Sequence, residues 1–497
     1  MGNSYDIRDW IDKRIKPEQI NKYISKGNGF INIQKINAKL SEKKSSDPKK
    51  IKDILSKSIE IKTLSLEETA CLLNVQDESL IDQMRQAALK VKKKVYDNRI
   101  VTFAPLYLGN FCVNDCLYCG FRKSNLEAQR KVLNMDEVGK ETEVLAGRIG
   151  HKRLIAVYGE HPLNDIDYIL KSLGQIYKVK VPARKGFGQI RRVNVNAPVF
   201  SIEELKGLKA AGIGTYQVFQ ETYHEPTYSK IHPQGTIKSD YLWRLYCMHR
   251  AFEAGIDDVG LGVLFGLYDW KYEVMSLCAH NIELEEKFSI GAHTISFPRL
   301  EPAQNSPFTA KSGFKVEDED FKKIMLVIRL SLPHSGMIIT ARESASMRRD
   351  SLALGITQTD ASTRIGIGAY SEQDCSQDIG RQQFILGDTR SLDEIIREFS
   401  QLGYITSFCT AGYRCGRTGK CIMDLLRSGQ EGKFCKLNAV LTFREWLDDF
   451  ASEETKKAGE IIIKKELAEI ENKLPEFYPK LVEYYKKISE GGRDLYF

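Results

Sequence analysis

The sequence predicts an α/β fold built around a parallel (β/α)8 barrel of the TIM type, with an N-terminal helical extension and a C-terminal, cysteine-bearing helical domain. From about residue 100, short β-rich runs alternate with longer segments in which apolar residues recur every three to four positions. This alternation repeats about eight times over roughly 280 residues, as a closed parallel barrel requires. An open, doubly wound sheet is the alternative, because both folds alternate strands with helices.

Three regions follow from this pattern: a helical extension over 1–92, the barrel over 93–375, and the cysteine-bearing domain over 376–497. After residue 375 the alternation stops, and glycines and cysteines gather before two final helical stretches. The predicted barrel strands begin near Val101, Ile155, Arg191, Thr215, Asp258, Ala292, Met337 and Gly355.

The composition excludes several classes of protein. The chain has 497 residues, of which 42% are hydrophobic and 28% charged, so it can bury a large core and is not disordered. The net charge of +7 is small, and basic residues are interleaved with acidic ones, so we expect no nucleic-acid partner. There is no apolar run long enough to span a bilayer and no N-terminal signal region, which predicts a cytoplasmic protein without a membrane partner. Eleven cysteines in a reducing compartment favour metal binding over disulfides.

The strongest local signal is a cysteine triplet, Cys112, Cys116 and Cys119, which directly follows the first predicted strand. Three thiolates at this C-x3-C-x2-C spacing can each bind one iron of a 4Fe-4S cluster and leave the fourth iron open. A structural zinc is the alternative, but it would need a fourth Cys or His nearby, and none follows within the next thirty residues.

Polar residues also follow the other predicted strands. Barrel enzymes place their chemistry at the carboxyl ends of strands, so these residues are candidates for cofactor or substrate binding. Each taken alone is more often a structural ion pair or a surface residue, and it is the shared strand-end position that favours a functional role. The candidates are Gly159 and Glu160 after the second strand, Asn194, Asn196 and Glu221 at the third and fourth, and Arg299 and Arg342 at the sixth and seventh.

A cysteine triplet at the mouth of a β/α barrel resembles the radical S-adenosylmethionine (SAM) superfamily. Tyr118, directly before Cys119, also fits the cluster loop of that superfamily. The resemblance implies that the amine and carboxylate of SAM bind the open iron, and that one electron cleaves SAM to a 5′-deoxyadenosyl radical.

Longer stretches resemble one family within that superfamily. PLYLGNFCVNDCLYCGFR, GIGTYQVFQETYHEPTYSKIHP, HTISFPRLEPA and the tail SFCTAGYRCGRTGKC are similar to the HydG family, the tyrosine lyases of FeFe-hydrogenase maturation. The similarity runs from about Ser65 to Ile470. The thiamine-pathway tyrosine lyase is a near relative that lacks the cysteine-bearing tail.

The resemblance implies a SAM-binding 4Fe-4S cluster, with Glu160 on the SAM amine, and L-tyrosine as substrate, its carboxylate held by Arg342 and Thr340. Cleavage of the Cα–Cβ bond would give p-cresol and dehydroglycine. A second cluster in the tail would convert dehydroglycine to carbon monoxide and cyanide on an extra iron, for which His280 is the candidate ligand. The implied partners are an electron donor such as ferredoxin or flavodoxin, and other hydrogenase maturation proteins.

The tail departs from the family pattern C-x2-C-x22-C, because its three positions hold Cys409, Gly412 and Cys435. Glycine cannot bind iron, so a second cluster would need Cys415 or Cys421 as a substitute. Two alternatives to the full activity therefore remain. One is a lyase that stops at p-cresol and dehydroglycine, which hydrolyses to glyoxylate, and the other is a non-catalytic iron–sulfur carrier.

Overall fold

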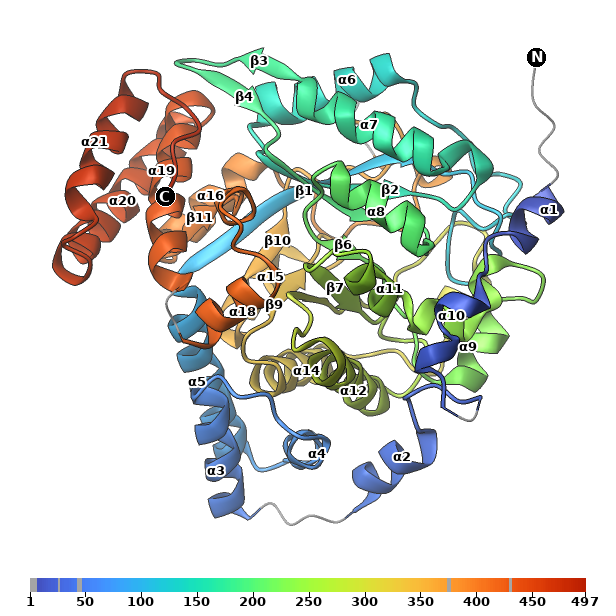
Figure 1. Cartoon of the computed structure of the whole chain (residues 1–497). Helices are drawn as coiled ribbons and strands as arrows, with labels where there is room; N and C mark the ends of the chain where they lie inside the picture. The colour runs from blue at the N-terminus through green and yellow to red at the C-terminus, as the bar shows by residue number, and fades with distance from the viewer. Residues whose placement is uncertain (1–6, 26, 43–46, 373–376, 429–430) are drawn as a thin grey trace.

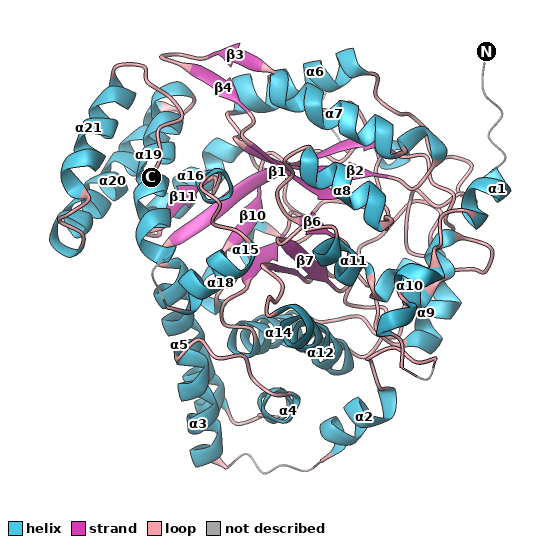
Figure 2. Ribbon diagram, viewed as in Figure 1, coloured by secondary structure: helices cyan, strands magenta, loops and turns pink. Residues whose placement is uncertain are grey.

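The architecture comes from a computed structural model, which describes residues 7–25, 27–42, 47–372, 377–428 and 431–497 (Figure 1). A barrel of strands occupies the centre and helices surround it (Figure 2). The blue N-terminal helices pack along one side, and the red C-terminal helices pack on another.

Eight parallel strands form the barrel. Neighbouring strands follow one another in chain order, apart from the two short strands β3 and β4, which form a separate antiparallel pair. Pairing of β10 with β1 closes the circle, with Val101 opposite Gln358 and Phe103 opposite Asp360. This closure confirms the predicted barrel and excludes the open sheet. The barrel strands are β1 (Arg99–Gly109), β2 (Arg153–Tyr158), β5 (Arg192–Asn196), β6 (Tyr216–Gln217), β7 (Val259–Gly262), β8 (Thr294–Ser296), β9 (Gly336–Ile339) and β10 (Gln358–Asp360).

Helices connect the strands and cover the barrel from outside. Several begin with a capping box, in which the N-cap side chain and a glutamate three residues later satisfy each other's backbone N–H groups. These helices are α6 (Met135–Glu143), which continues as the π-helical turn η3 (Val144–Ile149), α7 (Ile166–Lys178), α8 (Ile202–Ala210), α9 (Glu225–Ile231), α10 (Tyr241–Leu245), α11 (Cys247–Glu253), α12 (Trp270–Phe288), α13 (Pro307–Lys311), α14 (Asp318–Ser331) and α15 (Ala345–Ser351).

The N-terminal extension consists of α1 (Ile7–Asp12), α2 (Ile33–Ser41), α3 (Pro48–Ile59), α4 (Leu66–Leu73) and α5 (Glu78–Tyr96). Its apolar residues join the same hydrophobic core as the barrel, and α5 packs against α14. The predicted boundary at residue 92 falls inside α5, and Lys92 Nζ donates a hydrogen bond to the Leu352 carbonyl on the barrel side. The predicted boundary at 375 lies outside the described residues. The division into three regions stays a prediction.

The C-terminal region contains α16 (Leu392–Gln401), α17 (Ala411–Arg414), α18 (Gly419–Arg427), α19 (Glu431–Asp449), α20 (Glu453–Lys473) and α21 (Tyr478–Ser489). A short strand that the sequence analysis did not predict, β11 (Ile405–Ser407), pairs in parallel with the amino-terminal half of β1. β1 therefore has three partner strands, β2, β10 and β11. This arrangement places Cys409 next to the amino-terminal end of the barrel.

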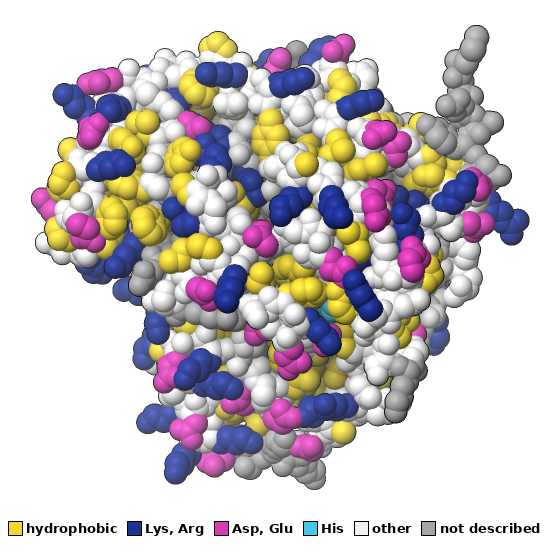
Figure 3. Space-filling model, in the orientation of Figure 1, with side chains coloured by type: hydrophobic (Ala, Val, Ile, Leu, Met, Phe, Trp, Pro, Cys, Tyr) yellow, Lys and Arg dark blue, Asp and Glu magenta, His cyan; other side chains and the backbone are white. Residues whose placement is uncertain are grey.

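The surface carries both signs of charge. Figure 3 shows basic and acidic side chains intermixed over one face of the molecule, with apolar side chains scattered between them. Among the described helices, none is both long enough and apolar enough to cross a bilayer.

Candidate active site

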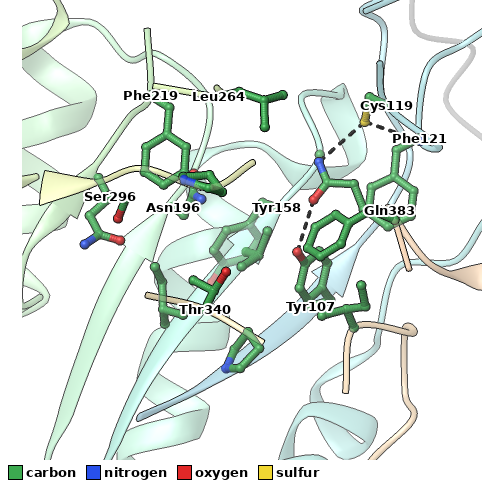
Figure 4. Close-up of a pocket in the computed structure, with 18 of the residues that line it drawn as sticks. Tyr107, Cys119, Phe121, Tyr158, Asn196, Phe219, Leu264, Ser296, Thr340 and Gln383 are labelled. Atoms are coloured by element: carbon green, nitrogen blue, oxygen red, sulfur yellow. Dashed lines mark hydrogen bonds between the residues drawn. The ribbon is translucent and has the colours of Figure 1, made fainter. Parts of the chain in front are cut away.

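A cavity of about 220 Å³ lies at the carboxyl ends of the barrel strands. Its walls carry apolar and aromatic side chains and a small number of polar groups, the usual composition of a ligand site. Figure 4 shows Phe219, Leu264 and Asn196 on one side of it and Tyr107, Cys119 and Gln383 on the other, with Thr340 between them. We call it the central cavity. Most of the site residues predicted from the sequence line it.

The loop after β1 brings Cys112, Cys116 and Cys119 to the wall of the central cavity. Their three sulfurs do not all lie within 4.8 Å of one another, whereas thiolates bound at 2.3 Å to a single zinc would be about 3.8 Å apart. The residues lining the cavity include no histidine and no further cysteine. This donor set fits an iron–sulfur cluster with one open iron better than a structural zinc. Burial raises the pKa of the Cys112 and Cys116 thiols to about 11, so coordination to a cation is what would hold them as thiolates.

Glu160 also faces the central cavity, at the end of β2. Its Oε2 accepts a hydrogen bond of 2.6 Å from Asn114 Nδ2, whereas its buried Oε1 has no protein partner. Burial raises the pKa of this carboxyl group. A buried acceptor without a partner can accept a hydrogen bond from a ligand in the cavity. Gly159 is required for packing, because a Cβ there would lie 2.2 Å from the carbonyl oxygen of Phe111, in the loop after β1 that carries the three cysteines and that we call the cluster loop.

Glu221 and Tyr118 line the cavity as well, but both already have partners. Glu221 Oε1 lies 2.6 Å from Lys238 Nζ and 3.4 Å from Arg244, and these two cations, against the effect of burial, lower the pKa of its carboxyl group. The Tyr118 hydroxyl lies 2.9 Å from His232 Nε2. Both residues therefore shape the cavity wall through fixed contacts.

Asn196 reaches the cavity, but Asn194 and Arg299 do not line it. Asn194 lies two residues before Asn196 on β5, further from the cavity. Its side chain accepts a hydrogen bond of 3.0 Å from the Thr215 backbone N–H. Arg299 turns away from the cavity, where its Nε lies 3.0 Å from Glu343 Oε1. Their expected roles in binding cofactor or substrate are not supported by these positions.

Arg342 and Thr340, which follow β9, line the central cavity. The guanidinium of Arg342 stacks on Phe384, 3.2 Å from the ring centroid, and within the described part of the chain it forms no ion pair, although the charges of Glu301 and Glu221 act on it. The Thr340 hydroxyl is buried and has no protein partner. An unpaired guanidinium beside an unpaired hydroxyl is suited to bind a carboxylate.

A second cavity of about 50 Å³ lies at the opposite, amino-terminal end of the barrel. Cys409, Gly412 and Cys435 all line it, so the three positions of the family pattern do meet in space. Cys415 and Cys421 are exposed and do not line it. The residues present thus offer two thiols, which do not fit the three-thiolate site of a 4Fe-4S cluster.

The structure does not bring His280 to this second cavity. His280 is buried on α12, where its Nδ1 lies 2.8 Å from the Tyr223 hydroxyl, and it lines neither cavity. His293 lines the second cavity instead, with its Nδ1 2.7 Å from Asp258 Oδ2. A carboxylate behind an imidazole is typical of metal-binding histidines. The position of His293 at the start of the run HTISFPRL, just before a barrel strand, is the signal that could have identified it.

The barrel, the cysteine loop and the unpartnered Oε1 of Glu160 define a radical SAM enzyme. The radical SAM superfamily model matches residues 106–277, and the biotin and thiamin synthesis associated domain matches 296–405. The crystal structure of HydG, a maturase of the [FeFe]-hydrogenase, is 47% identical, with a TM-score of 0.88, and the match covers 94% of this chain and 100% of that one. The chain belongs to the HydG family.

Two further matches agree with this assignment. HydG from Carboxydothermus hydrogenoformans is 35% identical, with a TM-score of 0.75, over 92% of this chain and 97% of that one. The 2-iminoacetate synthase of Escherichia coli is 29% identical over 320 residues, which are 64% of this chain and 81% of the relative.

Proposed function

We propose that this enzyme cleaves L-tyrosine between Cα and Cβ to p-cresol and dehydroglycine. The observation that carries the proposal is the unpaired Arg342 guanidinium, which faces the same cavity as the three cysteines. The HydG family membership supports tyrosine as the substrate. Dehydroglycine is 2-iminoacetate, so the name of the Escherichia coli relative supports the second product.

The residues of the central cavity would have different roles, set by the chemistry of their side chains. A 4Fe-4S cluster with SAM, when bound, would supply the radical chemistry that removes a hydrogen atom from the tyrosine amino group. Cys112, Cys116 and Cys119 would hold that cluster, and Glu160 Oε1 would accept a hydrogen bond from the SAM ammonium. Arg342 and Thr340 would hold the tyrosine carboxylate. Apolar side chains such as Phe219 and Leu264 exclude water, which protects a radical from side reactions.

The test uses anaerobically reconstituted protein with SAM, L-tyrosine and dithionite, and measures 5′-deoxyadenosine and p-cresol together. We expect both products from the parent and neither from Cys116→Ala. Cys247→Ala is the matched control, because Cys247 is buried outside the cavity, where its thiol contacts the Tyr216 hydroxyl. A parent protein with a full cluster that forms 5′-deoxyadenosine but no p-cresol would refute tyrosine cleavage. Absence of both products would instead favour the iron–sulfur carrier.

The second cavity favours an enzyme that stops at dehydroglycine and does not continue to carbon monoxide and cyanide. Gly412 stands at the wall where the family pattern has its middle cysteine, and the exposed Cys415 and Cys421 do not line this cavity. We therefore propose that dehydroglycine leaves the enzyme and hydrolyses to glyoxylate and ammonia. A ferredoxin or flavodoxin would supply the electron in the cytoplasm.

Gly412→Cys tests this second proposal. Gly412 lies in α17 and is not among the described residues with positive φ, so its backbone accepts a side chain. We expect the iron content to rise from about four to about eight atoms per chain, as one more 4Fe-4S cluster requires. Carbon monoxide, trapped by reduced haemoglobin, should be near zero for the parent. Stoichiometric carbon monoxide from the parent would contradict the proposal.

A further inference from the structure

Segment 382–387 of the C-terminal region crosses the mouth of the barrel and is fixed against the cluster loop. The Gly120 N–H donates a hydrogen bond of 3.1 Å to the Gln383 carbonyl, and the Ile385 N–H donates one of 3.2 Å to the Pro302 carbonyl. A Cβ at Gly120 would lie 2.9 Å from the Gln383 carbonyl oxygen, so the glycine permits this close approach. The position of the Gln383 backbone is therefore set by the cluster loop itself.

The side-chain amide of Gln383 bridges the cluster loop and the central cavity. Its Nε2 lies 3.4 Å from Cys119 Sγ, and its Oε1 accepts a hydrogen bond of 3.1 Å from the Tyr107 hydroxyl (Figure 4). Burial raises the pKa of Tyr107, so its hydroxyl keeps its proton and acts as the donor. An amide oxygen that accepts from Tyr107 directs the NH2 group toward the sulfur.

The three cluster cysteines differ in the hydrogen bonds that they accept. Cys119 Sγ accepts from Gln383 and also from the Phe121 backbone N–H at 3.4 Å. Cys112 Sγ lies 3.7 Å from Asn114 Nδ2 and also accepts from the backbone N–H groups of Asn114 and Glu160, whereas among the described residues no donor is seen for Cys116. Hydrogen bonds to the sulfurs of a cluster raise its reduction potential, because they stabilise the charge that the extra electron brings. Of the two side-chain amides that contact these sulfurs, Gln383 makes the shorter contact.

Tyr107 lines the central cavity, where L-tyrosine would bind. We propose that Gln383 is a positioning residue that couples the occupancy of the cavity, sensed by the Tyr107 hydroxyl, to the reduction potential of the cluster through Cys119. This inference rests on the proposed function for the identity of the occupant only. An occupant that changes the hydrogen bond of Tyr107 changes the position of the amide that faces the sulfur, so the reduction potential of the cluster differs between the occupied and the empty cavity.

The test is a redox titration of the reconstituted, SAM-loaded protein, followed by the EPR signal of the reduced cluster, with and without L-tyrosine. For Gln383→Leu we expect the equilibrium constant for reduction to fall about tenfold, which is 59 mV for one electron, and the response to tyrosine to disappear. Tyr107→Phe should lose the tyrosine response as well. Gln382→Leu is the control, because the Gln382 side-chain oxygen has no hydrogen-bond partner, and it should behave as the parent does.

Gln383→Leu that titrates at the parental potential and keeps the tyrosine response would overturn the inference. If Gln383→Leu does not assemble its cluster, the test rests on Tyr107→Phe, because Tyr107 contacts no cluster cysteine directly. A Tyr107→Phe protein whose reduction potential still responds to tyrosine would then overturn the inference. Loss of that response would support it. The change in reduction potential that Gln383→Leu causes in the absence of tyrosine does not depend on turnover. A parent that makes no p-cresol while Gln383→Leu still shifts the potential would therefore refute the proposed function and leave the role of Gln383 standing.

Discussion

Replacing Arg342 by alanine removes a guanidinium that faces the central cavity and that feels the charges of Glu301 and Glu221 without a described ion pair of its own. A charge-assisted pair enclosed in a binding site costs about 2–5 kcal/mol when one partner is removed. Arg342 is partly accessible from the cavity, so the lower part of that range applies, about 2–3 kcal/mol. At 1.4 kcal/mol for each factor of ten, Arg342→Ala should weaken L-tyrosine binding about 30- to 150-fold.

The assay is calorimetric titration of L-tyrosine into reconstituted, SAM-loaded protein, with the ratio of p-cresol to 5′-deoxyadenosine as a second measurement. Arg342→Ala should also lower this ratio, because tyrosine that is not held in place leaves SAM cleavage uncoupled. Arg342→Lys should bind with intermediate affinity, since it keeps the charge and loses the two-pronged geometry.

Arg299→Lys is the matched control for this experiment. It changes an arginine that also follows a barrel strand but contacts Glu343 and Asp318 outside the cavity. We expect its affinity for tyrosine to equal that of the parent. If Arg342→Ala bound tyrosine as tightly as the parent, the assignment of the carboxylate site would be wrong.

Two further predictions concern the cluster loop and acid stability. Gly159→Ala should reduce the iron bound per chain, because its Cβ would displace the loop at Phe111, whereas Gly174→Ala on α7, with open space around it, should bind iron normally. His151 Nε2 donates a hydrogen bond of 3.0 Å to the Ala361 carbonyl, and burial lowers the pKa of the imidazole to about 4. Because the unfolded chain binds this proton near pH 6.5 and the folded chain does not, stability falls as the pH drops from 6.5 towards 4, by about 2 kcal/mol at pH 5. Urea unfolding at pH 7 and 5 should show a smaller loss for His151→Gln, and an equal loss would contradict the assignment.

The features that the sequence predicted correctly are local ones. Each of the eight strands has its own apolar run, and the spacing of Cys112, Cys116 and Cys119 needs no knowledge of the fold. Strand-end position also brought Glu160 and Arg342 to one cavity, because all parallel strands of a barrel end at the same face.

The features that the sequence did not predict depend on contacts between distant segments. Position at a strand end does not give the direction of a side chain, and Asn194 and Arg299 each bond to neighbours outside the cavity. Whether His280 or His293 lies beside the tail cysteines depends on the end of the barrel against which the tail packs. The pairing of β11 with β1 determines that end. Gln383 lies in a segment without periodicity, and its role follows from the approach of that segment to Gly120.

The three pairings of β1 have a consequence for the order in which the protein is made. β1 is synthesised early, but β10 and β11, which complete its hydrogen bonding, lie roughly 250 and 300 residues further along the chain. At 5–20 residues per second, the ribosome needs about 15–60 s to produce them after β1 has emerged. During that time the cluster loop is attached to an open sheet edge, and the segment containing Gln383 has not yet been made. Cluster insertion into a finished site must therefore wait until nearly the whole chain has left the ribosome, and a chaperone that covers apolar strand edges would protect β1 in the interval.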